Sequence, residues 1–394
     1  MDDQGHDTAD SAEVSGTRSF LPAVEGMRAC AAMGVVLTHV AFQTANSSGW
    51  YGRLFTRFDL AVAVFFALSG FLLWRGHAAA ARGLRHRPPT GHYLRSRIVR
   101  IMPGYLVAVV VILALLPDAH ADLTVWLANL TLTQVYVPLT LTAGLTQMWS
   151  LAVEVSFYLV LPLLALLARR LPVDWRVPAI AALAVASFAW PALPWHLPFG
   201  VNQMNWLPAL FSWFAAGMLL AELTVMPVGR MHQLARRRWV MAAIAGVAFV
   251  IAATPLAGNI GLAPGTVGQV VVKTAMGAVV AGALLAPLVL DAPGTPHRIL
   301  GSTTMVTLGR WSYGLFIWHL AALAMVFPVI GEFPFNGHMP IVLILTWVFG
   351  FAIAAVSYAL IESPCRNLLR RWETRHAPAP LDSSISDEPE PAVV

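Results

Sequence analysis

The sequence predicts an all-α, polytopic membrane protein with about ten transmembrane helices and both termini in the cytoplasm. Of its 394 residues, 58% are hydrophobic and 11% are charged, whereas about a quarter of the residues in an ordinary soluble domain are charged. Apolar runs long enough to cross a bilayer alternate with short polar joints. These features exclude a soluble globular enzyme and a largely disordered chain. The continuous apolar runs also exclude a β-barrel, whose strands alternate.

Windows of about 19 residues predict ten spans. The spans lie near residues 22–42, 59–74, 101–116, 150–167, 177–193, 206–223, 240–254, 267–290, 311–331 and 340–361. The segment 123–136 is apolar enough to lie at the membrane interface or to re-enter the bilayer. Asn129 and several threonines in that segment argue against an eleventh span.

The basic residues predict how the spans are oriented. Twenty-one of them fall in the two tails and in every second joint, whereas only Arg53 and Arg57 fall in the opposite joints. Basic residues are in excess in cytoplasmic joints, so both termini are expected in the cytoplasm, in agreement with an even number of spans. The formal net charge of +5 therefore marks topology, and no nucleic-acid partner is expected. Arg28 and Lys273 are the two basic residues expected inside spans.

Three parts are expected along the chain. Residues 1–19 form an acidic, polar cytoplasmic tail without the basic start and apolar core of a cleavable signal peptide. Residues 20–365 form the membrane domain. Residues 366–394 form a cytoplasmic, largely disordered C-terminal tail rich in Pro, Ser and acidic residues. The two cysteines are too few for a disulfide framework.

Ionisable residues inside spans are candidates for function, because a charge at mid-bilayer costs about 2.5–3.5 kcal/mol on insertion scales. Arg28 and His39 are eleven residues apart on the first span, a spacing that returns to within about 20° of the same helix face, ~16 Å along the axis. We expect both to face one cleft, with Arg28 in the inner half and His39 deeper. The alternative is a pair of interior polar groups that only pack helices together.

Two further ionisable residues lie at comparable depth. Glu154 is about one turn into the fourth span, where it could orient the His39 ring so that one ring nitrogen acts as a base. Alternatively, Glu154 bonds to a helix hydroxyl such as Ser150 and serves packing alone. His319 lies near the middle of the ninth span and could be structural or functional. Lys273 could simply snorkel to the membrane surface, and the sequence leaves its role open.

Arg97 and Arg100 lie three residues apart on one helix face, just before the apolar part of the third span. Two guanidinium groups at this spacing can bind a phosphate. The alternative is that they anchor the span at the cytoplasmic face, which the other basic residues of this joint also do.

These elements, taken in order, resemble the acyltransferase 3 family, integral-membrane enzymes that O-acylate bacterial glycans, lipids and some antibiotics. The resemblance extends over nearly the whole chain. It rests on EGMRACAAMGVVLTH, FFALSGFLL, RSRIVRIMPGY, MWSLAVEVSFYLVLPLL, LGRWSYGLFIWH and IESPCRN, which occur in family order.

The resemblance implies roles for the residues that match the family's motifs. Arg28 and His39 match its Arg and His of the first span, with the His as the catalytic residue. Arg97 and Arg100 match the Arg-x-x-Arg element associated with the acyl-CoA donor. Glu154 belongs to a Ser-x-x-Glu element that is matched only loosely.

The chain departs from the family pattern at two positions. Val155 stands where a second acid often follows the Glu, which puts in doubt any role that needs two carboxylates. Ala63 stands where an Asp is usual two residues before the Phe pair, and Asp59, one helical turn earlier, could substitute for it.

The expected function is that of an O-acyltransferase in the cell (inner or plasma) membrane of a bacterium. It would move an acyl group, most simply acetyl, from cytosolic acyl-CoA to a hydroxyl of a cell-envelope glycan or glycolipid. His39 would act as general base, Glu154 would orient it, and Arg28 would act with it and help to hold the donor. Acyl-CoA is expected as a substrate, with no bound cofactor and no metal. Residues that could line the path are His319, Ser69, Tyr105, Trp149, Asp59 and Tyr313.

Several alternatives stay open at this point. An acyl-His39 intermediate could replace direct transfer. The acceptor could be a macrolide-type small molecule. The chain could also be a secondary transporter with an Arg, His and Glu relay, although no inverted repeat is visible, or part of a larger envelope assembly.

Overall fold

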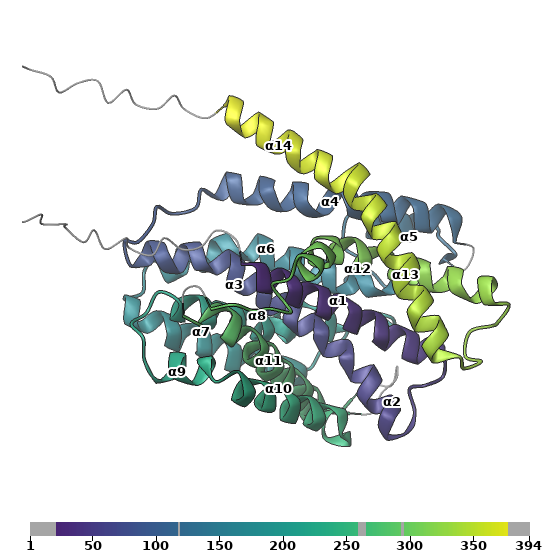
Figure 1. The fold of residues 1–394 in the computed structure, drawn as a ribbon, viewed down its shortest axis with the longest axis horizontal. Helices are drawn as coiled ribbons and strands as arrows, with labels where there is room; N and C mark the ends of the chain where they lie inside the picture. Colours follow the sequence, from purple (N-terminus) through teal and green to yellow (C-terminus); the bar gives the residue numbers. More distant parts are fainter. Residues whose placement is uncertain (1–20, 117–118, 259–264, 293–294, 377–394) are drawn as a thin grey trace, which may run out of the picture.

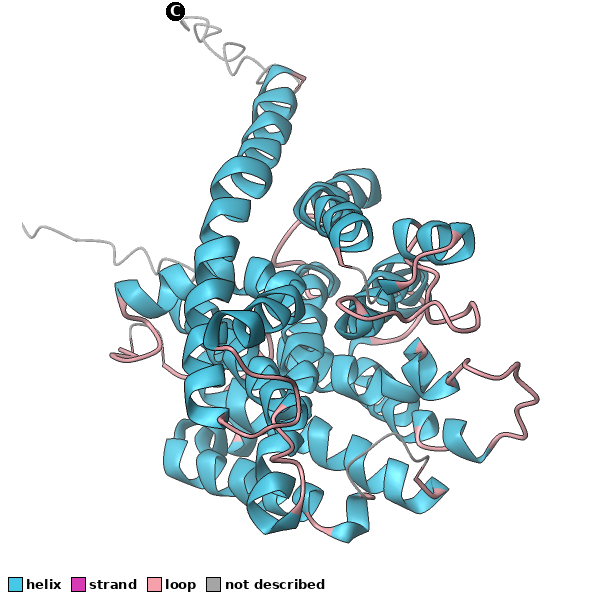
Figure 2. Cartoon of the chain, turned by 90° about the vertical axis from the view of Figure 1, so that its right-hand side faces the viewer, coloured by secondary structure: helices cyan, strands magenta, loops and turns pink. Residues whose placement is uncertain are grey.

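A computed structural model describes residues 21–116, 119–258, 265–292 and 295–376, and these residues form helices and connecting turns without any β-strand (Figures 1 and 2). Each predicted span corresponds to one helix. These helices are α1 (Pro22–Gln43), α3 (Ala61–Ala81), α4 (Thr90–Leu115), α6 (Trp149–Ala168), α7 (Val173–Ser187), α8 (Leu207–Leu223), α10 (Arg238–Ala253), α11 (Val267–Val289), α12 (Thr303–Ile330) and α13 (Met339–Ser357). The all-α, polytopic fold class is therefore confirmed.

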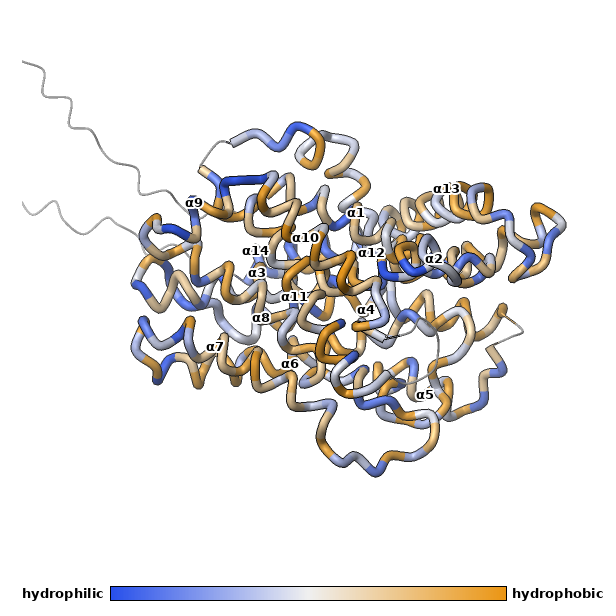
Figure 3. The backbone as a smooth tube through the Cα atoms, turned by 90° about the horizontal axis from the view of Figure 1, so that it is seen from below, coloured by the Kyte–Doolittle hydropathy of each residue, from blue (hydrophilic) through white to orange (hydrophobic). Residues whose placement is uncertain are grey.

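Eight helical segments in the described part of the chain are long and apolar enough to cross a membrane. The two other predicted spans depart from that criterion for different reasons. Helix α1 has 22 residues but carries Glu25, Arg28 and His39 along its length. Helix α10 is apolar but has only 16 residues. Hydrophilic stretches gather mainly at the helix ends and joints (Figure 3).

The shorter helices lie in the joints. They are α2 (Gly49–Thr56), α5 (Leu123–Leu130) and α9 (Arg230–Arg236). Helix α5 begins the segment 123–136, for which the sequence predicts an interfacial or re-entrant position. Its eight residues are too few to span a bilayer, and turns follow it up to residue 139. The expectation that this segment is not an eleventh span agrees with the structure.

The C-terminal part of the chain differs from the sequence prediction. A π-helical turn, Tyr358–Glu362, joins α13 to α14 (Ser363–Arg375), so residues 366–375 are helical and not part of a disordered tail. Helix α14 runs beside the first part of α4 (Figure 1). There the Arg95 guanidinium lies 4.9 Å from the centre of the Trp372 ring. The expected tails 1–19 and 377–394 lie outside the described residues.

Small residues let the central helices pack closely. A side chain on Gly217 of α8 would collide with the backbone carbonyl of Ala67 in α3, and one on Gly309 of α12 would collide with the carbonyl of Glu25 in α1. Close backbone approach at small residues is how membrane helices gain packing energy in the absence of a strong hydrophobic effect between them. These contacts bring α3 against α8 and α1 against α12.

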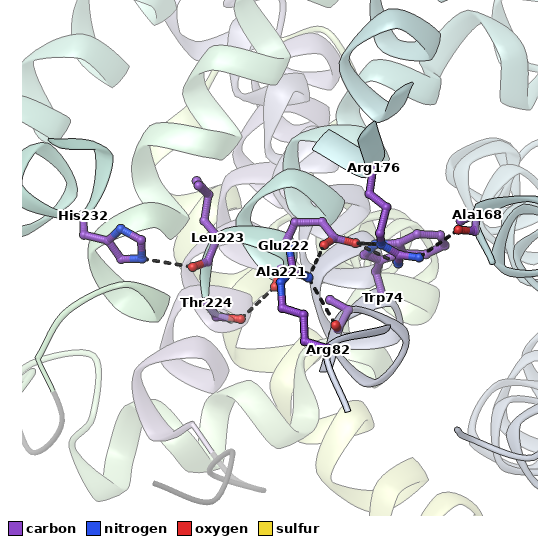
Figure 4. Close-up of polar contacts among 10 residues, drawn as sticks. Trp74, Arg82, Ala168, Arg176, Ala221, Glu222, Leu223, Thr224 and His232 are labelled. Atoms are coloured by element: carbon purple, nitrogen blue, oxygen red, sulfur yellow. Dashed lines mark hydrogen bonds and ion pairs between the residues drawn. The ribbon is translucent and has the colours of Figure 1, made fainter. Parts of the chain in front are cut away.

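A buried carboxylate joins three helices at one end of the bundle (Figure 4). Glu222 of α8 is fully buried and accepts hydrogen bonds from Trp74 Nε1 at 2.7 Å, Arg82 Nη1 at 2.6 Å and Arg176 Nε at 2.8 Å. Trp74 lies on α3, Arg82 directly follows α3, and Arg176 lies on α7. Arg176 also donates to the carbonyl of Ala168 at the end of α6. Because the buried charge is paired and hydrogen-bonded, this network ties the helix ends together.

We expect Glu222→Gln to lower the free energy of unfolding by about 3–5 kcal/mol, because Arg82 and Arg176 would lose the charge that compensates them in a buried site. Chemical denaturation in detergent micelles measures this difference. Glu332→Gln is the control, since Glu332 pairs with Asn336 and His338 in a joint near the surface and its loss should cost under about 1 kcal/mol. Equal stability of the two variants would contradict a structural role for Glu222.

Candidate active site

Helix α1, which carries the predicted catalytic residues Arg28 and His39, packs against α12, which carries His319. Arg28 Nε lies 3.5 Å from Ser312 Oγ, and the ring centres of His39 and His319 are 4.9 Å apart. Both contacts run in the same order along the two helices, so α1 and α12 are parallel. Parallel directions are what ten alternating spans require of the first and the ninth. Arg28 and His39 thus both lie on the side of α1 that faces α12.

A backbone contact determines which ring nitrogen of neutral His39 carries the proton. Its Nδ1 lies 3.2 Å from the carbonyl oxygen of Val35, one turn earlier on α1. A carbonyl only accepts hydrogen bonds, so this contact puts the ring proton on Nδ1 and leaves the lone pair on Nε2. His39 is also partly exposed. A neutral imidazole with a free and accessible Nε2 can act as a general base.

Glu154 has partners other than those predicted. It accepts hydrogen bonds from the Ser69 hydroxyl and from the Tyr158 hydroxyl, the latter at 2.5 Å. The Ser150 hydroxyl donates instead to the carbonyl of Gln147 at 3.2 Å. Neither the expected contact with His39 nor the alternative contact with Ser150 is present among the described residues. Since Val35 supplies the carbonyl that orients His39, that part of the sequence prediction is corrected.

A small internal cavity of about 50 Å³ lies between α1, α3, α6 and α12. Its polar lining comes from Arg28, Ser69, Ser150, Glu154 and Tyr313. A cavity of this size with several polar groups has room for a water molecule. Arg28 is part of the lining of this cavity, whereas His39 is not.

The three predicted donor-binding arginines form one electrostatic cluster. Arg28 and Arg97 each interact with Arg100, and both also interact with Glu154. Arg28 Nε lies 3.8 Å from an oxygen of Glu25. Arg97 Nε is buried and has no hydrogen-bond partner in the described parts of the chain. Like charges held together in this way favour the binding of an anion.

A family model described as an acyltransferase domain matches residues 21–361. The chain belongs to this acyltransferase family. It is also similar to the acyltransferase MdmB of Streptomyces mycarofaciens, with 27% identity over 387 residues that cover 91% of this chain and 95% of the relative. No solved structure matches the chain. The resemblance inferred from the sequence is therefore confirmed at the level of the family.

Glu362 is a residue of this acyltransferase that sequence reasoning missed. It ends the π-helical turn between α13 and α14, is 3% exposed and interacts electrostatically with Arg100 and Arg28. Its Oε1 has no hydrogen-bond partner within the described ranges. π-Helical turns are rare and occur often at functional sites. The IESPCRN string at the last exit was a signal that could have pointed to this carboxylate.

The other predicted path residues of the acyltransferase divide into two groups. Ser69 and Tyr313 line the small cavity, whereas Tyr105 and Trp149 do not. The Tyr105 hydroxyl donates to the carbonyl of Asn129 at 2.5 Å. Trp149 packs edge-on against the ring of Phe66. Both have contacts typical of a scaffold.

Asp59 pairs with a residue that was expected to snorkel. Its Oδ2 lies 2.5 Å from Lys273 Nζ of α11. Lys273 is therefore held by an ion pair with Asp59, and snorkelling alone does not account for its position. Asp59 does not line the small cavity, while Ala63, at the position where the family usually has Asp, is fully buried.

A larger cavity of about 590 Å³ was not predicted. It lies where the start of α1, the end of α3, α9 and the end of α11 meet, and Arg75, Arg236, Arg298 and His297 contribute basic groups to its lining. Volumes of 300–1,000 Å³ are usual for sites that bind small molecules. The sequence could not reveal this cavity because its lining comes from several segments that are far apart in the chain.

We expect Glu154→Gln and Ser69→Ala to be coupled in a double-mutant cycle, because Gln replaces the charged acceptor of the Ser69–Glu154 hydrogen bond by a neutral one and Ala removes its donor. Their effects on the free energy of unfolding should differ from additivity by about 0.5–3 kcal/mol. The cycle of Glu154→Gln with Ser150→Ala is the control and should be additive, since Ser150 donates to Gln147. Coupling to Ser150 and not to Ser69 would contradict the assigned partners.

Proposed function

We propose that this acyltransferase moves an acyl group, most simply acetyl, from cytosolic acyl-CoA to a hydroxyl of a cell-envelope glycan or glycolipid. Membership of an acyltransferase family supports transfer over the alternative of secondary transport. The observation that carries the proposal is the contact of His39 Nδ1 with the Val35 carbonyl. This contact holds Nε2 of His39 ready to accept a proton.

The proposed reaction needs one base and one leaving group. Nε2 of His39 takes the proton of the acceptor hydroxyl while the oxygen attacks the thioester carbonyl. A new C–O bond forms, and the C–S bond of the thioester breaks. His39 then returns the proton to the leaving thiolate, so the enzyme ends in its starting state. In this scheme no covalent acyl-His39 intermediate forms.

The arginine cluster is the proposed site for the phosphates of the donor. Electrostatic interactions link Arg97, Arg100 and Arg28. The buried Nε–H of Arg97 is a hydrogen-bond donor without a partner among the described residues. Guanidinium groups bind phosphates through charge-assisted hydrogen bonds. Because basic residues predict the cytoplasmic side, we place this cluster toward the inner face of a bacterial cell membrane, with both termini in the cytoplasm.

The acceptor hydroxyl would come from the outer face. The outer joints lack basic residues apart from Arg53 and Arg57 and carry aromatic residues such as Trp50 and Trp195. This composition suits a carbohydrate or a lipid-linked sugar better than a polyanion. A macrolide-type small molecule is the second candidate acceptor.

We expect His39→Ala to reduce acyl transfer by about 10²–10⁴-fold, the usual contribution of a general base. The measurement uses protein purified in detergent with labelled acetyl-CoA, and tests a lipid-linked sugar and a macrolide as separate acceptors. His376→Ala is the control, because this exposed histidine lies at the end of α14. Unchanged transfer by the His39 variant would remove His39 from the mechanism.

We expect the double variant Arg97→Ala, Arg100→Ala to raise KM for acetyl-CoA by about 10²–10⁴-fold, because each hydrogen bond to a charged group contributes about 1.5–3 kcal/mol and two arginines are removed. KM for acetyl-pantetheine, which lacks the nucleotide phosphates, should stay within about twofold. The matched variant is Arg236→Ala, Arg298→Ala in the larger cavity. An increase confined to this second variant would contradict the assignment and move the nucleotide to the larger cavity.

A further inference from the structure

His319 lies in contact with the proposed base but has no assigned role. It is fully buried on α12, and its ring meets the His39 ring at an interplanar angle of 70° with 4.9 Å between the ring centres. The two residues come from helices that are far apart in sequence and packed side by side. A histidine that served only to fill this space could be replaced by an apolar ring at lower cost, because buried polar groups are unfavourable unless they are satisfied.

The contacts of His319 leave one of its ring nitrogens unsatisfied. Its Nδ1 lies 2.7 Å from the carbonyl of Phe316, so the ring proton is on Nδ1 and the lone pair is on Nε2. Nε2 is buried and has no hydrogen-bond partner in the part of the chain that the structure describes. Buried acceptors without a partner are rare in native proteins and call for a physical explanation. A donor that forms only during the reaction supplies such an explanation.

Protonation of His39 creates such a donor. In the resting state both rings donate through Nδ1 to carbonyls of their own helices and present bare Nε2 atoms, so neither can donate to the other. When His39 takes the acceptor's proton on Nε2, it becomes an imidazolium that is a donor at both nitrogens. His319 is the neighbouring ring with a free acceptor.

We infer that His319 is a positioning residue for the reaction, whose Nε2 accepts a hydrogen bond from His39 once His39 is protonated. This inference rests on the proposed function. The proton passes from the acceptor hydroxyl to Nε2 of His39, is held there while the C–O bond forms and the C–S bond breaks, and then passes to the thiolate. His319 keeps its own proton on Nδ1 throughout.

The surroundings of the two rings contain no competing charge. Helix α1 packs on α3, α12 and α13, and α12 also packs on α4 and α13. Among the described residues, no ionisable side chain of these helices other than the two histidines themselves acts on either ring. Arg28, the nearest charged residue on α1 itself, is three turns away along that helix and bonds to Ser312. A hydrogen bond from His39 to His319 would therefore add to the one that Nδ1 of His39 donates to the Val35 carbonyl, so that both N–H groups of the imidazolium have an acceptor.

Three substitutions separate this role from simple packing. His319→Phe keeps the ring but removes both nitrogens. His319→Asn keeps a short polar group near the position of Nδ1 without an acceptor at the position of Nε2, whereas His319→Gln can place an amide oxygen close to that position. We expect kcat for transfer from acetyl-CoA to fall about 10- to 100-fold in the Phe and Asn variants and to be at least partly restored in the Gln variant. KM for acetyl-CoA should stay unchanged in all three.

The pH dependence of kcat supplies a readout that a packing role would not move. Loss of the acceptor makes protonation of His39 less favourable, so the acid limb of the profile should move to lower pH by about one unit in the Phe and Asn variants. Trp318→Phe is the matched control, because it removes an adjacent buried N–H that also lacks a hydrogen-bond partner in the described residues. Its kcat and pH profile should equal those of the wild type.

The outcomes distinguish the inference from the proposed function. If His39→Ala abolishes transfer while folded His319→Phe and His319→Asn proteins retain wild-type kcat and pH limb, the inference is overturned and the proposed function stands. If the Phe variant does not fold, the comparison of Asn with Gln decides, and equal kcat in these two variants also overturns the inference. If His39→Ala leaves transfer intact, the role of His39 as base fails and the inference fails with it; if the wild-type protein transfers no acetyl group to either acceptor, the proposed function itself fails.

Discussion

The parallel packing of α1 against α12 is the constraint on which the candidate site depends. It places Arg28 beside Ser312 and His39 against His319, so one helix pair defines both ends of the proposed reaction path. Gly309 permits this packing because a side chain there would collide with the backbone of α1. A change in the rotation of α1 would separate both residues from their partners at once.

Two kinds of buried charge occur in this bundle, and their hydrogen bonding distinguishes them. Glu222 accepts hydrogen bonds from Trp74, Arg82 and Arg176, as expected of a group that holds helices together. The cluster of Arg28, Arg97, Arg100 and Glu362 contains buried atoms without partners among the described residues. Unsatisfied buried groups are costly, and binding of an anionic donor would give the buried Nε–H of Arg97 an acceptor. The contrast therefore favours a structural role for Glu222 and a binding role for the arginine cluster.

The sequence predicted the helices well and the contacts between them only in part. Apolar runs and polar joints are local signals, and each of the ten predicted spans has a corresponding helix. The common side of Arg28 and His39 follows from spacing within one helix. The partners of Glu154 and His39, by contrast, depend on which helices are neighbours and on how each is rotated. No single-sequence pattern encodes those contacts.

Missed features share the same physical origin. His319 could be noted as an intramembrane histidine, but its contact with His39 joins residues 280 positions apart. The helical start of the C-terminal tail was missed because its composition is polar and charged, while its helicity is supported by packing on α4. The larger basic cavity combines residues from several joints. In the sequence alone, its arginines indicate only which side of the membrane each joint occupies.

The protonation of the two imidazole rings tests the central claim most directly. Nitrogen NMR of protein labelled at histidine, with single variants to assign the signals, reports which ring nitrogen carries the proton. The account predicts that at neutral pH His39 and His319 are both neutral and protonated on Nδ1, because each donates to a carbonyl of its own helix. A proton found on Nε2 of His39 would contradict its role as the base.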